Sequence, residues 1–108
     1  MRRGIMRLLK MHGFNSTLFE SADAILDHDD FGRAFCVIMD IDLNGESGIG
    51  VCRRLASMGI RLPVIFITGN DSDAVRTAAT EMGCLAYLTK PFEALSLIKP
   101  VEEARAAA

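Results

Sequence analysis

The hydrophobic positions of the chain fall into two alternating patterns. Three short runs are almost continuously apolar: residues 34–39 (AFCVIM), 63–68 (PVIFIT) and 84–88 (CLAYL). A run without polar alternation is typical of a strand buried on both faces, as in parallel sheets. Between these runs, apolar residues recur at helical spacing. The alternation predicts βα units, a parallel sheet covered by helices on both faces, and therefore the α/β fold class.

Five helices are predicted from the spacing of apolar residues. Ser21 and the cluster at residues 70–72 are suited to cap the second and fourth helices, and glycines end the first, third and fourth. The predicted inward faces are Ile5, Leu8 and Leu9; Ala22, Ile25 and Leu26; Ile49, Cys52 and Leu55; Val75, Ala78, Ala79 and Met82; and Leu95, Ile98 and Val101.

Three further segments complete the pattern. Residues 14–19 (FNSTLF) form a short β-like run, and residues 42–47 form a polar turn after the first apolar strand. Pro100 lies late in the last helix. Because proline lacks the backbone N–H that a helix interior needs, we expect a kink or an early end there.

Composition narrows the class of protein. The 108 residues fit one domain, and 12 basic against 14 acidic side chains give a net charge of −2. So weak a charge argues against nucleic acid or an anionic membrane as the main partner. No apolar run has the length of a membrane span. Three cysteines without a C-x-x-C motif argue against a disulfide framework or a zinc site, so we expect reduced thiols and a cytoplasmic location.

Polar residues with complementary chemistry follow the apolar strands. Asp40 follows the first run, Thr68 ends the second, and Lys90 follows the third. Because sites in parallel sheets form at the carboxyl ends of strands, these side chains are expected to meet. A carboxylate can accept a phosphoryl group, and a cation and a hydroxyl can stabilise the transferring oxygens. This set predicts phosphoryl chemistry.

Three stretches, CVIMDIDLNGESG, LPVIFITG and AYLTKPF, in this order, resemble the receiver domain of two-component response regulators. The resemblance covers nearly the whole chain and implies a doubly wound, flavodoxin-like receiver domain over residues 1–108. It implies that Asp40 takes a phosphoryl group from a histidine kinase or phosphotransfer protein. It also implies Mg²⁺ bound by the Asp40 carboxylate and the backbone carbonyl of Asp42, and a switch rather than a metabolic enzyme.

The same resemblance implies how the switch works. Thr68 would move toward the phosphoryl group, and Tyr87 would change rotamer. Lys90–Pro91 would be a cis peptide that aims the lysine at the site. The fourth helix, last strand and last helix would then present an altered surface to a downstream protein partner.

The chain departs from the family pattern at its beginning. Family members carry an acidic pair at the end of a first, central strand, whereas here no Asp or Glu precedes Glu20. Without that strand, residues 14–19 and the Asp40 strand each lose a hydrogen-bonding neighbour. The gap could be filled by direct pairing, by a second copy in a homodimer, or not at all. The chain could start at an internal methionine, be deliberately shortened, or be a degenerate receiver.

Two alternatives follow from these departures. With the acidic pair absent, Mg²⁺ binding is expected to be weak, because hard cations prefer several oxygen ligands. A degenerate chain would act as a phosphorylation-independent interaction module. Residues 40–45 also match the first half of a calcium loop, but Val51 stands where that loop requires a bidentate Glu, so we do not expect calcium binding.

Overall fold

The computed structural model describes residues 2–19, 21–28, 30–43 and 46–108. Its elements follow in the order α1 (Arg2–Met11), α2 (Ala22–Leu26), β1 (Val37–Asp40), β2 (Asp42–Leu43), β3 (Glu46–Ser47), α3 (Gly48–Ser57), β4 (Val64–Thr68), α4 (Asp73–Glu81), β5 (Ala86–Thr89) and α5 (Ala94–Ala107).

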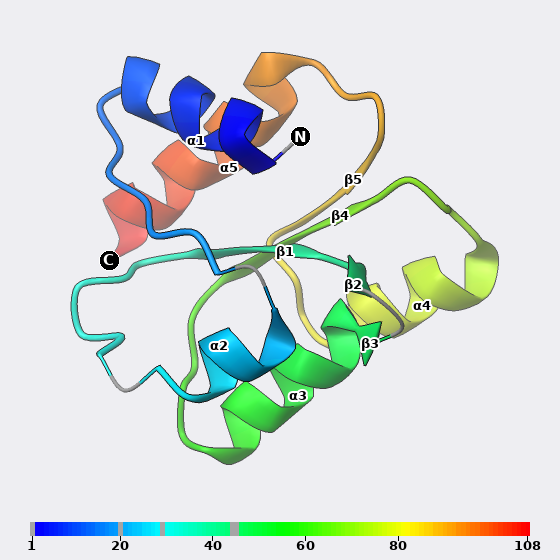
Figure 1. Cartoon of the computed structure of the whole chain (residues 1–108). Helices are drawn as coiled ribbons and strands as arrows, with labels where there is room; N and C mark the ends of the chain where they lie inside the picture. Colours follow the sequence, from blue (N-terminus) through cyan, green and yellow to red (C-terminus); the bar gives the residue numbers. More distant parts are fainter. Residues whose placement is uncertain (1, 20, 29, 44–45) are drawn as a thin grey trace.

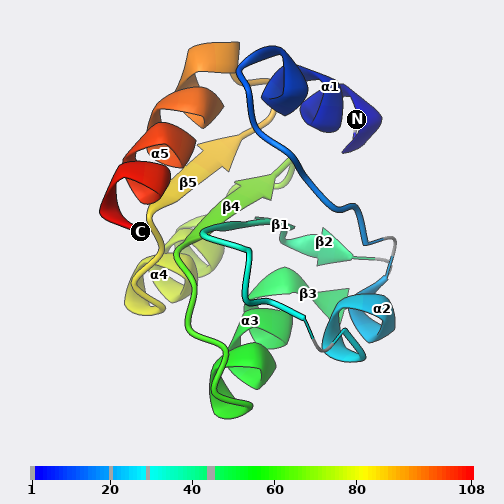
Figure 2. The ribbon, with the colours of Figure 1, turned by 90° about the vertical axis from the view of Figure 1, so that its left-hand side faces the viewer.

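The main sheet has three parallel strands in the order β1-β4-β5. Helices α1 and α5 cover one face, and α2, α3 and α4 cover the other (Figures 1 and 2). The predicted doubly wound α/β architecture is confirmed. In this register Asp40 lies beside Ile67, and Thr68 lies beside Thr89, so the strand ends are level at one edge.

Strand β4 separates two hydrophobic cores. Ile65 packs with residues of α1 and α5, including Leu9 and Leu97, whereas its neighbour Phe66 packs with residues of α2, α3 and α4. Both β4 side chains are fully buried. Successive side chains of a strand point to opposite faces, so the positions of a strand that lie between two helical layers are apolar on both faces. This requirement explains the unbroken apolar run.

Local signals set the ends of several helices. The hydroxyl of Ser21 accepts a hydrogen bond from the Ala24 amide at the start of α2, and Ser72 does the same for Val75 at the start of α4. Each supplies a partner for an amide that has none within the helix. After α3, Gly59 has φ +87°, a left-handed conformation that glycine adopts without a steric penalty.

The strand predicted for residues 14–19 does not form. Its residues belong to no helix or strand, and β1 is an edge strand in the described part of the chain. A strand forms only when its backbone can hydrogen-bond to a neighbouring strand, and the sequence pattern of residues 14–19 does not show whether such a neighbour exists. Phe14 is instead buried against the α1–α5 core. The possibility that this segment pairs directly with the Asp40 strand is therefore excluded.

Helix α5 continues through Pro100, so the predicted early end is wrong. Leu97 and Ile98 before the proline, and Val101 and Ala104 after it, are buried. Their packing against the sheet outweighs the backbone hydrogen bond that proline removes. None of the helices in the described ranges has the length and apolarity needed to cross a bilayer.

Two strand boundaries also differ from the prediction. β1 begins at Val37, three residues after the start of the apolar run, and the Val37 amide donates to the Pro63 carbonyl. At its other end β1 includes Asp40. β5 runs from Ala86 rather than from Cys84. The predicted polar turn after β1 is built as a short antiparallel pair, β2 with β3, around residues 44–45, which lie outside the described part.

Candidate functional site

The carboxyl edge of the sheet collects the polar residues that the sequence singled out. Asp40 is the last residue of β1, Thr68 is the last residue of β4, and Lys90 directly follows β5. Because the three strands are parallel and adjacent, their ends lie at the same edge. The Lys90–Pro91 peptide bond is cis.

Asp40 and Lys90 are in direct contact. Lys90 Nζ donates to Asp40 Oδ2 at 2.9 Å, and both side chains are 25% exposed. The other carboxylate oxygen, Oδ1, accepts a hydrogen bond from the Asp42 amide at 2.9 Å. The carboxylate is thus fixed at both oxygens, by a cation on one side and by the backbone on the other.

Thr68 lies beside this pair but bonds a different carboxylate. Its side chain is fully buried, and its hydroxyl donates to Asp42 Oδ2 at 3.3 Å. The same hydroxyl accepts from the Asn70 amide at 3.0 Å. The structure therefore brings the Asp42 side chain into the site, whereas the sequence resemblance gave Asp42 only a backbone role.

Gly48 is a site residue that sequence reasoning missed. It begins α3, and its amide donates to the Ile41 carbonyl at 2.8 Å. A Cβ at this position would overlap the Asp40 carbonyl oxygen and lie 2.8 Å from Met39 Cγ. Only glycine lets α3 approach the strand end that carries Asp40. The sequence shows only a glycine next to Ser47, and because glycine is common in turns and at helix ends, that position alone does not indicate a close approach.

Tyr87 does not join the strand-end residues. Its hydroxyl donates to Asp71 Oδ1 at 2.8 Å, and Asp71 also pairs with Arg76 at 2.7 Å. Burial, followed by the hydrogen bond to Asp71, raises the pKa of Tyr87 to about 12. From the sequence, Asp71 belongs to a predicted capping cluster, and Arg76 has no predicted role. Asp71 and Tyr87 are 16 positions apart in the sequence, so no local pattern links them.

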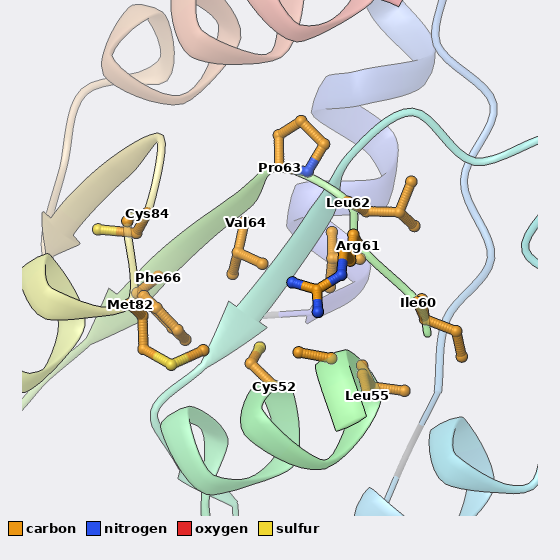
Figure 3. A pocket seen from close by; sticks show the side chains of 13 residues that line it. Cys52, Leu55, Ile60, Arg61, Leu62, Pro63, Val64, Phe66, Met82 and Cys84 are labelled. Carbon is orange, nitrogen blue, oxygen red and sulfur yellow. The ribbon is translucent and has the colours of Figure 1, made fainter. Parts of the chain in front are cut away.

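A cavity of about 380 Å³ lies at the opposite ends of the strands (Figure 3). Val37 and Val64, the first residues of β1 and β4, line it together with Cys52, Leu55 and Phe66. Its walls are mostly apolar. Because it lies beside the amino ends of the strands, it is separate from the polar edge around Asp40.

The polar edge has the components of a phosphoryl-transfer site. A carboxylate can attack phosphorus, a lysine can neutralise charge on the transferring oxygens, and a hydroxyl can hydrogen-bond one of them. Asp40 and Thr68 are the last residues of rigid strands and Lys90 directly follows one, which restricts their positions better than long loops would.

Comparison with known proteins identifies the family. Residues 1–102 match the profile of the response regulator receiver domain. The chain is 36% identical over 91 residues to sensory transduction protein RegX3 of Mycobacterium tuberculosis, covering 84% of this chain and 40% of that protein. It is 33% identical over 105 residues to transcriptional regulatory protein FixJ of Bradyrhizobium diazoefficiens, covering 96% and 51%.

Solved structures agree with the sequence comparison. A response regulator receiver protein from Burkholderia phymatum is 40% identical and superposes with a TM-score of 0.80, over 98% of this chain and 86% of that chain. The chain spans at most about half the length of the two curated relatives. Together with the strand-end carboxylate, lysine and threonine, these matches show that the chain belongs to the response regulator receiver domain family of two-component signalling.

Proposed function

We propose that Asp40 is a phosphoacceptor, loaded by the phosphohistidine of a histidine kinase or phosphotransfer protein. The observation that carries this proposal is the 2.9 Å contact between Lys90 Nζ and Asp40 Oδ2 at the carboxyl edge of the sheet. A lysine held against one partly exposed carboxylate places positive charge where a phosphoryl group on that carboxylate would add negative charge.

The proposed reaction exchanges one bond to phosphorus for another. A carboxylate oxygen of Asp40 attacks, the phosphorus–nitrogen bond of phosphohistidine breaks, and the imidazole leaves with its electron pair and takes up a proton. The product is an acyl phosphate on Asp40. Attack by water on the same phosphorus later restores the carboxylate and releases inorganic phosphate. Positioning and charge neutralisation account for most of such catalysis.

Two side chains are placed to respond to the new charge. The Lys90 ammonium needs only to exchange the Asp40 oxygen for a phosphoryl oxygen. The Thr68 hydroxyl, now at 3.3 Å from Asp42, can redirect its proton toward a phosphoryl oxygen. A fully buried hydroxyl has few alternative partners, so its reorientation reports the chemical state of the neighbouring site.

The oxygen ligands at this edge fit a weak Mg²⁺ site. The Asp40 carboxylate accepts from the Asp42 amide, which brings two carboxylate residues together. Mg²⁺ is often held by one or two carboxylates, with water and phosphate oxygens completing its shell. When bound, it would neutralise charge on the phosphoryl oxygens. Asp40 and the Asp42 backbone carbonyl, which the family resemblance implies as ligands, would hold it.

The consequence of phosphorylation would be signalling rather than metabolism. In this proposal the chain is a cytoplasmic switch whose α4–β5–α5 surface changes for a downstream protein partner. The covalent charge change would bias a packing element with two states. A homodimer formed at the β1 edge remains a prediction.

Intact-mass spectrometry after incubation with acetyl phosphate and Mg²⁺ tests the proposal. The wild-type chain should gain one phosphoryl group, and Asp40→Asn should gain none. Asp73→Asn, an exposed aspartate on α4, is the matched control and should be modified like the wild type. Circular dichroism must show all three chains folded. Uptake that survives Asp40→Asn contradicts the assignment.

A phosphorylation-independent interaction module is the second candidate function. Among the described residues, no group of three or more His, Cys, Asp or Glu side chains is placed to hold a metal ion. A receiver fold without a working metal site could still bind partners through its surface. Mg²⁺ titration followed by amide chemical shifts separates the two. Shifts centred on Asp40 favour the phosphoacceptor, and a folded chain without shifts favours the interaction module.

A further inference from the structure

The cavity at the amino ends of the strands is built from separate parts of the chain (Figure 3). Helix α3 contributes Cys52 and Leu55, residues 60–64 lead into and begin β4, and residues 82–84 follow α4. The cavity volume of about 380 Å³ lies toward the lower end of the range of about 300–1,000 Å³ that is typical of small-molecule sites. The cavity is therefore large enough for one small organic molecule.

The walls of this cavity present apolar surface that is not fully covered. Leu55 and Phe66 are buried, whereas Ile60, Val64 and Met82 remain partly exposed. Removal of exposed apolar surface from water is the main driving force for binding a hydrocarbon group. The partly exposed side chains therefore offer a surface against which a hydrocarbon chain can pack.

Arg61 adds a positive charge to this apolar surface. Among the described residues that line the cavity it is the one charged side chain. Figure 3 shows its guanidinium turned inward, toward the side chains that line the cavity. None of the ion pairs in the described ranges includes Arg61, whereas Arg54 and Arg76 each pair with a carboxylate. The Arg61 guanidinium is thus available to an anionic group of a ligand.

The apolar walls and the single cation together define the class of ligand. A neutral hydrocarbon would cover the walls but would not use the charge of Arg61. Inorganic phosphate would use the charge but would leave the apolar walls exposed to water. A carboxylate can accept two parallel N–H bonds from a guanidinium, and a hydrocarbon chain attached to it can lie along the walls.

We propose that this cavity binds a free organic carboxylate with a single hydrocarbon chain, such as a medium-chain fatty acid. The carboxylate binds Arg61, and the hydrocarbon chain lies between α3 and residues 82–84. Because the cavity lies at the opposite ends of the strands from Asp40, the site is independent of the proposed phosphoryl chemistry.

An octanoate titration, followed by the amide chemical shifts of the whole chain, tests the location of the site. Octanoate should cause saturable shifts at Cys52, Leu55 and Val64. The amides of α1, which lies on the other face of the sheet, should not shift (Figures 1 and 2). Octanol, which has the same hydrocarbon chain without the charge, should shift the same amides but bind more weakly than octanoate.

Two arginine variants test the contribution of the charge. Arg61→Gln changes an exposed side chain, so the fold should persist. It should weaken octanoate binding by roughly three- to ten-fold, because a charge-assisted pair with a carboxylate is lost, and it should leave octanol binding unchanged. Arg7→Gln, at an exposed arginine of α1, is the matched control and should bind octanoate like the wild type.

A third variant tests the contribution of the cavity itself. Ala56 lies on α3 and lines the cavity. Ala56→Leu places a larger side chain there, so it should weaken the binding of octanoate and octanol alike. Circular dichroism must show the variant folded. If it is not folded, the comparison of octanoate with octanol and the Arg61→Gln variant still decide the proposal.

Several results would overturn the proposal. Octanoate that shifts no amide at the cavity up to its solubility limit refutes the site. Shifts spread over α1 and over exposed apolar residues such as Met11 refute it too, because they indicate detergent-like contact. If octanoate and octanol bind equally, and Arg61→Gln changes neither, the ligand class is wrong. Asp40→Asn should bind octanoate like the wild type, and a loss of binding there contradicts the independence of the two sites.

Discussion

Replacing Gly48 with alanine should destabilise the fold and displace the candidate phosphoacceptor together. The added Cβ would overlap the Asp40 carbonyl oxygen and lie 2.8 Å from Met39 Cγ and 3.0 Å from the Asp40 carbonyl carbon. Two of these three atoms belong to the backbone of β1, which cannot rotate away as a side chain could. Either α3 or the end of β1 must therefore move.

Gly50 provides a control of the same substitution in the same helix. A Cβ there would meet only Ser47 Cβ, at 4.0 Å. Alanine exceeds glycine in helix propensity by about 1 kcal/mol, so Gly50→Ala should stabilise the chain by about 0.5–1 kcal/mol. Overpacking costs about 1–3 kcal/mol, and a backbone clash lies at the upper end of that range. After subtraction of the gain of about 0.5–1 kcal/mol in helix propensity, Gly48→Ala should be about 1–2 kcal/mol less stable than the wild type.

Thermal and urea unfolding followed by far-ultraviolet circular dichroism measure both variants. For a domain of this size, about 1 kcal/mol shifts Tm by roughly 4–8 °C, so the two variants should differ by roughly 10–20 °C. Gly48→Ala should also take up the phosphoryl group more slowly than Gly50→Ala. A Gly48→Ala chain at least as stable as the wild type would refute the argument that α3 packs directly on the Asp40 carbonyl.

Three further predictions concern other parts of the molecule. Lys90→Ala should still take up a phosphoryl group, but it should lose the rotamer change of Tyr87, which tyrosine emission reports because Tyr87 is the one tyrosine of a sequence without tryptophan. An emission change on phosphorylation that equals that of the wild type contradicts the coupling role of Lys90. Burial raises the pKa of the Cys36 thiol from 9.0 to about 11, and that of the Cys52 thiol from 9.0 to about 12. As pH rises, these thiols therefore ionise in the unfolded chain at a lower pH than in the folded chain. The free energy of unfolding should fall as pH rises above about 9. Cys52→Ala should show a smaller decline in urea midpoint between pH 8 and 11, and an equal decline argues against the shift. Pro100→Ala restores an amide donor inside α5 and should stabilise the fold by about 2 kcal/mol, which a Tm at or below that of the wild type would disprove.

The sequence predicts the parallel sheet because each strand packs against a helical layer on both of its faces and is therefore apolar along an unbroken run. Ile65 and Phe66 are adjacent in β4 and pack into different cores, so neither position tolerates a polar side chain. The same logic predicts which residues follow the strands, and hence that Asp40, Thr68 and Lys90 share an edge. These three residues meet because parallel strands end at the same edge of a sheet, and the alternating order of strands and helices along the chain makes the strands parallel.

Features that depend on a partner elsewhere in the chain could not be predicted in this way. Residues 14–19 have the composition of a strand, but their backbone finds no strand to pair with in the described structure. Pro100 should have ended a helix by local rules, yet buried side chains on both sides of it keep α5 intact. In both cases tertiary packing or pairing overrides a local propensity.

The partners of the hydrogen bonds around the site could not be predicted from the sequence either. The sequence places Thr68 at the edge, but only the structure shows that its hydroxyl bonds Asp42 rather than Asp40. The contact between Asp71 and Tyr87 depends on the path of the β4–α4 loop, which no spacing rule encodes. Residue types and strand order define which groups meet, whereas loop geometry decides how they bond.

Locating a phosphoryl group within the chain tests the central claim most directly. After incubation with acetyl phosphate and Mg²⁺, sodium borohydride reduces an aspartyl phosphate to homoserine, and peptide mass spectrometry identifies the reduced position. The account predicts homoserine at position 40 alone in the wild-type chain, and at no position in Asp40→Asn. A folded wild-type chain that carries the mark on another carboxylate, or carries none, would contradict it.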